Sequence, residues 1–236
     1  GLNRVGFDSK EISELITSIN NDDFIKVEGV FSHLSASEDH LETEFSLKQI
    51  SLFKQSFIKI IDNIKDKPLI HICNTSGIIN FPDAHFDMVR SGIGIYGFSN
   101  KLNESNSLIP VVSLKSTISQ IHDIGKSDSV GYNRAYVAPK DQRAATIPLG
   151  HADGISRAYG NGKGFVYIDN KKAAIIGNVC MDMLMVDVSD IDCEEGDEVI
   201  VFNEKYTAEQ LAESAGTISY ELLAGLSQRI ERKFIN

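Results

Sequence analysis

The chain has 236 residues, a net charge of −10 and a hydrophobic content of 42%, values typical of a globular protein with one large domain or two smaller ones. The acidic balance argues against a surface for nucleic acid or anionic lipid. Because no apolar run approaches the length of a membrane span, we expect neither nucleic acid nor a membrane among the partners.

Cysteine and histidine spacing bounds the chemistry further. The three cysteines are widely spaced and form no CxxC pair, which favours a reducing compartment such as the cytoplasm. The six histidines show no zinc-ligand spacing, so we expect no metal site.

Residues 1–107 alternate strand-like and helix-like segments. This alternation indicates βα units and a parallel sheet. The first helix has an apolar face, and Ser9 is its expected N-cap. The expected elements are helices near residues 9–19 and 50–64 and strands at 24–33, 68–74 and 86–98.

The sequence pattern changes after a polar segment that ends at Pro110. We therefore divide the chain into domains 1–107 and 108–236. Short β-rich runs separated by Gly, Asn and Asp follow, with helices expected at 207–216 and 219–230. This pattern predicts an α+β or mostly β second domain.

Polar residues lie near the expected carboxyl ends of strands in the first domain: His33 after "VEGVFS", Asn74 and Thr75 after "LIHIC", and Arg90 in "MVRSGIG". Parallel sheets bind ligands at the carboxyl ends of their strands. Thr75 and the glycine-rich turn at Gly92 fit a phosphate cradle, although a Thr-Ser-Gly turn is also ordinary loop chemistry. Arg90 lies among apolar residues, and its permanent charge requires an anion or a strong acceptor.

Three compact clusters stand out in the second domain: "VGYNRAY" (130–136), "GHADG" (150–154) and "NVCMDM" (178–183). From these residues alone, Tyr132 fits a strand tyrosine at least as well as a proton carrier. Asp153 equally fits a turn residue, and Met181 a core side chain.

Seven segments, taken together and in order, carry a resemblance: "GLNRVGF", "GVFSHLSASED", "HICNTSGI", "FDMVRSGIGIYG", "VGYNRAYVA", "TIPLGHADGISR" and "IIGNVCMDMLMVDV". They span nearly the whole chain, which resembles the alanine racemases, enzymes that depend on pyridoxal phosphate (PLP). The resemblance implies that residues 1–107 form the C-terminal half of a PLP-binding, TIM-like α/β barrel. It implies a mostly β racemase domain at 108–236 and a homodimer in which the second domain of one subunit completes the active site of the other.

The resemblance also implies roles for individual residues. The implied catalytic residues are Tyr132, His33 and Arg90, where His33 orders the catalytic network and Arg90 faces the pyridine nitrogen of PLP. The implied PLP-binding residues are Asn74, Thr75, Gly92 and Ile93, besides Arg90. The implied substrate-binding residues are Arg4, which contacts the carboxylate, Met181 and Asp182. The implied supporting residues are Arg157, His151 and Asp153.

The implied reaction interconverts L-alanine and D-alanine, and D-alanine supplies peptidoglycan. PLP acidifies the α-proton of the amino acid, and racemisation then needs acid/base groups on both faces. The resemblance assigns one face to Tyr132 and the other to the lysine that holds PLP. Cationic neighbours, with His33 and Arg90 as candidates, are expected to favour the phenolate of Tyr132.

Several departures from the family pattern set further expectations. No lysine here lies in a "VKANAYG"-like context, and the chain opens where the middle of the barrel is expected. We therefore expect a fragment that is inactive alone and that associates through an exposed strand edge. His151 and Gln228 stand where many members or some members, respectively, have tyrosine.

Three alternatives remain open. The first is a related PLP racemase for serine or for several amino acids, and the second is a PLP-barrel decarboxylase, which the three second-domain clusters disfavour. The third is a non-catalytic segment that dimerises or completes a site within a larger bifunctional cell-wall protein.

Overall fold

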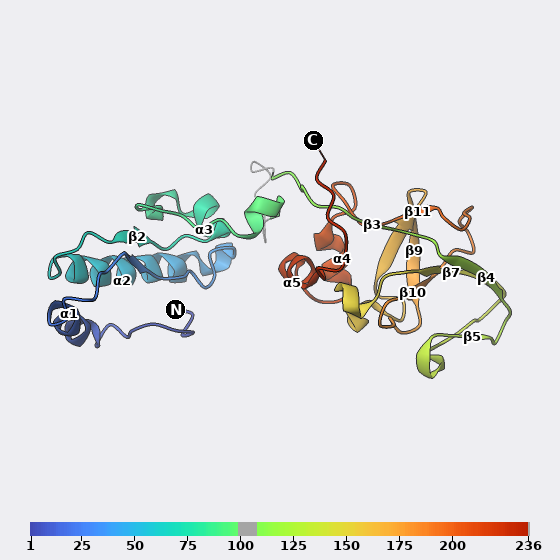
Figure 1. The fold of residues 1–236 in the computed structure, drawn as a ribbon, viewed down its shortest axis with the longest axis horizontal. Helices are drawn as coiled ribbons and strands as arrows, with labels where there is room; N and C mark the ends of the chain where they lie inside the picture. Colours follow the sequence, from blue (N-terminus) through green and yellow to red (C-terminus); the bar gives the residue numbers. More distant parts are fainter. Residues whose placement is uncertain (99–107, 236) are drawn as a thin grey trace. The chain divides into compact units, whose positions relative to one another are not determined.

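The computed structural model describes residues 1–98 and 108–235 (Figure 1). The chain divides into two compact units, with the boundary between Leu108 and Ile109. Within the described residues, no helix is both long enough and apolar enough to cross a membrane. The same residues contain no cluster of three or more His, Cys, Asp or Glu side chains suited to a metal ion.

The first unit is built from two βα repeats. Its strands β1 and β2 are parallel, with Gly29 opposite Leu69 and Phe31 opposite His71. Alternating strands and helices and a parallel sheet are therefore confirmed in this unit. The helices are α1 (Ile12–Asn20), α2 (Thr43–Ile61) and α3 (Thr75–Asn80), and the strands are β1 (Gly29–Phe31) and β2 (Leu69–His71).

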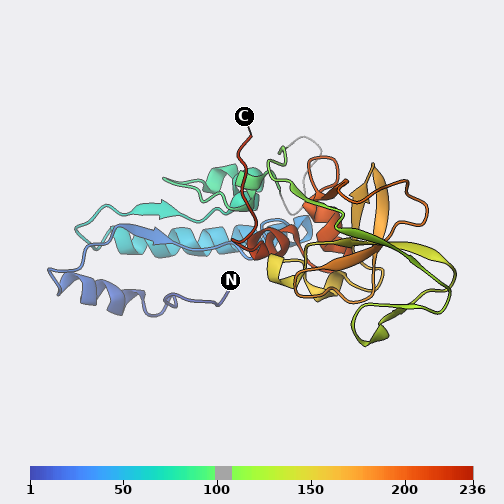
Figure 2. The ribbon, with the colours of Figure 1, turned by 45° about the vertical axis from the view of Figure 1, so that its right-hand side comes forward.

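The long helix α2 runs along the two strands (Figure 2). Its residues Ile50 and Phe53 are buried against Ile70 and Ile72, from β2 and the residue just after it, and against Leu34. The ring of Phe53 also meets the Phe57 and Phe86 rings edge-on. This apolar packing holds the strands against α2 and so positions the polar residues near the strand ends.

The strand expected at residues 86–98 is wrong. This segment runs beside β2, but a side chain takes the place of a backbone acceptor there. The Asp87 carboxylate accepts from the Ile70 amide at 2.8 Å. The segment then ends in a 3-10 turn, η3 (Ile93–Tyr96). Its glycines and the side-chain bond of Asp87 explain why an apolar, strand-like pattern does not form a strand here.

The expected N-cap of the first helix is also wrong. Helix α1 begins after Glu11, not after Ser9. The carboxylate of Asp8 accepts from the Lys10 amide at 3.0 Å, and the Asp8 amide donates to the Glu11 carboxylate at 2.6 Å. These local bonds form a turn before the helix and displace its start by two residues.

The second unit contains a seven-stranded antiparallel sheet in the order β3-β11-β8-β9-β10-β7-β4. Strands β3 and β4 lie at opposite ends of this order, yet only Ile118 and Ser119 separate them. The Ile118 amide donates to Asp197 O at 3.0 Å, and the Ser119 amide donates to Thr146 O at 2.9 Å. The continuous segment 114–124 therefore closes the sheet on itself. The strands are β3 (Leu114–Thr117), β4 (Gln120–Ile124), β7 (Gln142–Ile147), β8 (Phe165–Ile168), β9 (Lys171–Ile176), β10 (Leu184–Asp187) and β11 (Glu198–Phe202).

Two short helices accompany this sheet, α4 (Ala208–Ser214) and α5 (Ser219–Gly225). Both lie within the predicted helical segments. Leu211 of α4 and Leu222 of α5 are buried, as are the sheet residues Ile147, Leu184 and Val199. A separate two-stranded hairpin, β5 (Ser129–Val130) and β6 (Tyr136–Val137), carries Tyr132.

Candidate active site

Arg90 is the centre of a polar cluster at the ends of β1 and β2. Its Nη1 donates to Nδ1 of His71, and its Nη2 donates to Ser32 O at 2.8 Å. The same Nη2 lies 3.3 Å from both His33 Nδ1 and Ile72 O. Because the two strands are parallel and in register, residues just after each strand meet at one edge, and Arg90 binds both.

The charges in this cluster are unbalanced. Among the described residues no carboxylate forms an ion pair with Arg90. Burial, together with the charges of Arg90 and Arg4, lowers the pKa of His33. Burial and Arg90 also lower the pKa of His71. Both histidines are therefore neutral at pH 7, which leaves each Nδ1 free to accept from the guanidinium.

His71 is a site residue that sequence reasoning missed. Its ring stacks on Phe31 with centroids 5.1 Å apart and an interplanar angle of 4°, and Arg90 lies over the same Phe31 ring at 5.4 Å. A histidine inside the apolar run "LIHIC", near an arginine that needs an acceptor, was the available signal.

Thr75 organises the glycine-rich segment next to this cluster. Its Oγ1 accepts from the Gly92 amide at 3.0 Å and from the Gly94 amide at 3.3 Å. A Cβ atom on Gly94 would lie 2.8 Å from Thr75 Cγ2, so a larger residue there would displace the Thr75 side chain. The neighbouring Asn74 caps α3 through Oδ1, which accepts from the Gly77 amide at 2.9 Å. The structure thus brings Asn74, Thr75 and Gly92 together, with Ile93 following directly in η3.

Tyr132 lies in an exposed turn of the second unit and not on a strand. It begins a 3-10 turn, η4 (Tyr132–Arg134), between β5 and β6, and 72% of its surface is exposed. Gly131, Asn133 and Arg134 around it all have positive φ angles, of 78°, 60° and 49°. The interpretation of Tyr132 as an ordinary strand residue is therefore wrong.

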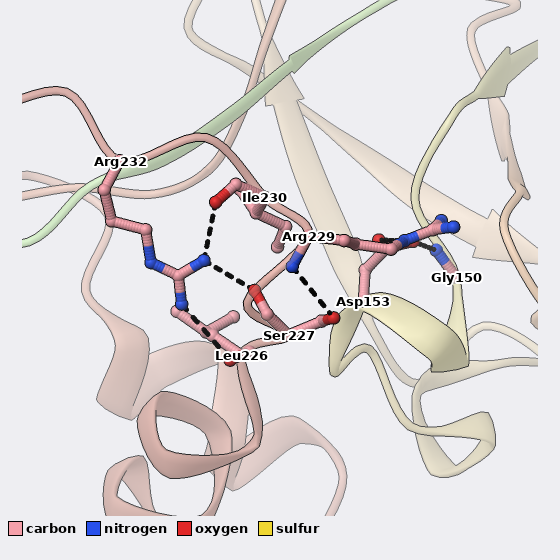
Figure 3. Close-up of polar contacts among 7 residues, drawn as sticks. All are labelled: Gly150, Asp153, Leu226, Ser227, Arg229, Ile230 and Arg232. Atoms are coloured by element: carbon pink, nitrogen blue, oxygen red, sulfur yellow. Dashed lines mark hydrogen bonds and ion pairs between the residues drawn. The ribbon is translucent and has the colours of Figure 1, made fainter.

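The "GHADG" turn is fixed by a buried carboxylate. Asp153 Oδ2 accepts from the Gly150 amide at 2.8 Å, and Arg229 donates to both carboxylate oxygens (Figure 3). Burial alone raises the pKa of Asp153, but the bonds from Arg229 and Gly150 outweigh it and hold the pKa below its usual range. Arg229 is a second residue that sequence reasoning missed, because it lies 76 positions away from its partner.

The same turn supports the "CMDM" segment. The His151 amide donates to Cys180 O at 3.0 Å, and the Ala152 amide donates to Met181 O at 2.8 Å. Met181 itself is 65% exposed, so its interpretation as a core side chain is wrong. The bond to Asp153 raises the pKa of Arg229, and the charge of Asp182, beside Met181, adds to this effect.

Arg157 and Arg4 are the remaining predicted site residues. Arg157 is exposed at the start of a 3-10 turn, η6 (Arg157–Tyr159). Within the described residues, no hydrogen bond joins its side chain to Tyr132. Arg4 is exposed, and its charge is felt at His33.

Two family models match the chain: "Alanine racemase, N-terminal domain" over residues 1–100, and "Alanine racemase, C-terminal domain" over residues 111–234. The chain belongs to the alanine racemase family. It is 35% identical over 247 residues to the alanine racemase of Halothermothrix orenii and 36% identical over 248 residues to that of Treponema denticola. Each match covers 100% of this chain and 64% or 65% of the relative, so the chain spans just under two thirds of their length.

A solved structure gives the same family. The chain matches alanine racemase from Bartonella henselae, described with covalently bound pyridoxal phosphate, at a TM-score of 0.88 and 29% identity. The match covers 100% of this chain and 64% of that one. The predicted fold class, part of an α/β barrel followed by a mostly β domain, is confirmed as that of alanine racemases.

Proposed function

We propose that the natural polypeptide containing this chain is a PLP-dependent alanine racemase that interconverts L-alanine and D-alanine by two-base proton transfer. The observation that carries the proposal is the cluster at the strand ends of the first unit. There Arg90, which has no carboxylate partner among the described residues, is bonded to two histidines next to a cradle of threonine and glycine.

The residues of this cluster fit PLP. Thr75, whose Oγ1 gathers two backbone amides, would hold the phosphate with Asn74, Gly92 and Ile93. Glycine at 94 keeps this cradle open, since a Cβ there would collide with Thr75. When bound, PLP withdraws electrons from the amino acid and so acidifies its α-proton.

Arg90 would face the ring nitrogen of the cofactor. A fixed cation disfavours a second positive charge beside it, so Arg90 keeps that nitrogen unprotonated. Because the pKa of His33 is lowered, His33 is neutral at pH 7, and we assign the cationic role to Arg90 alone. His33 and His71 then orient the guanidinium through their Nδ1 atoms.

Tyr132 would carry the proton on one face of the α-carbon. Its 72% exposure on the hairpin turn leaves the phenol accessible to a substrate presented by another surface. The opposite face requires the lysine of the family, and no lysine among these 236 residues has its sequence context. We therefore expect these residues alone to lack racemase activity. Further assignments are Arg4, Met181 and Asp182 to substrate binding, and His151, Asp153 and Arg157 to support of the site.

The proposal includes a homodimer with shared active sites. The exposed Tyr132, Met181 (65%) and Met183 (44%) of the second unit are apolar groups suited to burial against a second copy. Mixing Tyr132→Phe subunits with Thr75→Val subunits tests this. Shared sites should restore about a quarter of wild-type activity, since half of the randomly mixed dimers contain one intact site. A mixture no more active than its components would argue for self-contained sites.

The Tyr132→Phe substitution tests the reaction itself. The variant should retain the visible absorbance of bound PLP, while exchange of the α-proton with deuterated water is lost from one enantiomer more than from the other. Tyr136→Phe is the matched control, because Tyr136 lies on the same hairpin but its hydroxyl donates to Gln142 of β7 at 2.7 Å. Equal loss of exchange from both enantiomers would assign Tyr132 a positional role.

We place the proposed enzyme in the cytoplasm, where its product supplies peptidoglycan synthesis. The three widely spaced cysteines accord with that compartment.

Comparing turnover of L-alanine and L-serine distinguishes an alanine enzyme from a broader racemase. Serine turnover comparable to that of alanine would require a wider assignment.

A further inference from the structure

Asn178 connects the Tyr132 turn to the segment that carries Met181. Its Nδ2 donates to the carbonyl oxygen of Tyr132 at 3.1 Å. Its Oδ1 accepts from Asn161 Nδ2, also at 3.1 Å. The Asn161 backbone is itself fixed, because its amide donates to Gly177 O at 2.8 Å. The amide of Asn178 is thus held on both sides, with its donor directed at Tyr132.

The turn that Asn178 supports is strained. Asn133 and Arg134 are two consecutive non-glycine residues at positive φ, 60° and 49°. Each such residue costs about 1–2 kcal/mol relative to a right-handed conformation. A turn of this kind persists only where its surroundings hold it. Within the described part of the chain, Asn178 gives the only side-chain hydrogen bond to residues 131–135 from another segment.

Two glycines bring the backbones of both segments into contact. A Cβ on Gly131 would lie 3.3 Å from the Asn178 amide nitrogen, and a Cβ on Gly177 would lie 2.7 Å from Val130 O. This close approach places the Asn178 side chain beneath the turn. The side chain therefore acts between two segments that already touch.

We propose that Asn178 is a positioning residue for Tyr132, and that Asn161 sets the orientation of its amide. The hydrogen bond fixes the carbonyl at the start of the strained turn and so fixes the direction of the Tyr132 side chain. Because Asn178 also opens the segment 178–183, it ties the proton carrier to the exposed Met181 and Asp182. Only the catalytic consequence rests on the proposed function.

Asn178→Asp is the sharpest variant, because it keeps the shape and the acceptor facing Asn161 but removes the donor facing Tyr132. Fluorine NMR of the 3-fluorotyrosine-labelled protein reports on its seven tyrosines, and Tyr132→Phe identifies the Tyr132 resonance. We expect Asn178→Asp to shift or broaden that resonance. Asn170→Asp is the matched control, since Asn170 Oδ1 contacts Tyr206 at 3.1 Å and should affect Tyr206 instead. A folded Asn178→Asp protein with an unchanged Tyr132 resonance overturns the proposal.

A double-mutant cycle in the natural, PLP-loaded polypeptide tests the consequence. Asn178→Asp should lower kcat about 10- to 100-fold, the effect of a misplacement near 1 Å, with KM changed less than about twofold. In the Tyr132→Phe background the same substitution should cost no further activity. If the losses of activity from the two substitutions multiply instead, Asn178 does not act through Tyr132 and the positioning role is overturned. A wild-type protein without racemase activity, combined with the expected NMR shift, overturns the proposed function while the positioning stands.

Discussion

Arg229 grips the carboxylate of Asp153 with two nitrogens, Nε 2.5 Å from Oδ1 and Nη2 2.9 Å from Oδ2. The pair joins the C-terminal segment to the "GHADG" turn (Figure 3). The Ser227 amide reinforces the connection by donating to Asp153 O at 3.1 Å. Only 3% of the Asp153 side chain is exposed, against 52% for Arg229, so the aspartate is the buried partner.

Replacing Asp153 with alanine should destabilise the second unit by about 1–3 kcal/mol, because the buried Gly150 amide loses its acceptor. Urea unfolding followed by circular dichroism measures the loss. Lys115→Ala is the control, since it removes an exposed ion pair with Glu198 and should change stability by less than about 1 kcal/mol. Equal effects of the two substitutions would contradict the structural importance of Asp153.

Stability of the first unit should fall as the solution is acidified below about pH 6.5, the ordinary histidine range. His33 and His71 have lowered pKa values in the folded chain, so the unfolded chain binds protons first. Their contribution is thus present above the unfolded pKa and is lost as pH falls through it towards the folded pKa. Hydrogen exchange of peptides covering β1 and β2 detects the change. His71→Asn keeps an acceptor for Arg90 and should flatten the pH dependence of stability. An unaltered pH profile in this variant would show that His71 does not cause the loss of stability.

Gly177→Ala should destabilise the chain more than Gly162→Ala. Both glycines have positive φ, 68° and 81°, so both substitutions add backbone strain of about 1–2 kcal/mol. Only at Gly177 does the new Cβ also meet backbone, Val130 O at 2.7 Å, whereas Gly162 faces open space. Thermal unfolding of the two variants separates the contributions. Equal melting temperatures would show that Gly177 makes no close approach to the Tyr132 hairpin.

Thr75→Val should weaken PLP binding in the natural polypeptide at least about tenfold, the equivalent of 1.4 kcal/mol. The substitution leaves the Gly92 and Gly94 amides without the Oγ1 acceptor and removes a hydroxyl donor for the phosphate. Thr75→Ser retains the hydroxyl and should bind nearly as the wild type does. Titration followed by PLP absorbance compares the variants. Similar affinities for valine and serine would exclude Thr75 from the phosphate site.

The open sheet of the first unit should make the 236-residue chain associate. Within the described residues β1 and β2 pair only with each other, and Phe31 and Leu69 are 63% and 51% exposed. Sedimentation should therefore give a mass above 26.0 kDa. Phe31→Lys places a charge on β1 and should reduce strand-mediated association. Tyr132→Lys, on the second unit, should instead weaken the proposed dimer, so the two substitutions distinguish the two routes of association. A monomeric wild-type chain would refute both routes.

Much of the fold was predictable because its signals are local. The alternation of apolar strands and amphipathic helices gave the parallel pair, and Gly, Asn and Asp at turns gave the β-rich second unit. The polar residues after β1 and β2 were predictable as a group for the same reason, since parallel strands bring their carboxyl ends together.

The errors came from interactions between distant residues or from single side chains. Residues 86–98 are apolar enough for a strand, but Asp87 bonds the β2 backbone with its side chain. His71 and Arg229 escaped notice because their importance depends on Arg90 and Asp153, which lie 19 and 76 positions away. No periodicity in the sequence records such pairs.

The two units differ in how their sheets end, because segment 114–124 joins both ends of the second unit's sheet. The two end strands of this sheet, β3 and β4, belong to one continuous segment, and the buried residues, from Ile147 to Leu222, all lie within the same unit. A polypeptide of residues 109–236 should therefore be obtainable as a separate, monodisperse module at the concentrations that solution NMR requires. Such a module would carry Tyr132, Asn178 and the Asp153–Arg229 pair, so their local geometry can be determined without the cofactor.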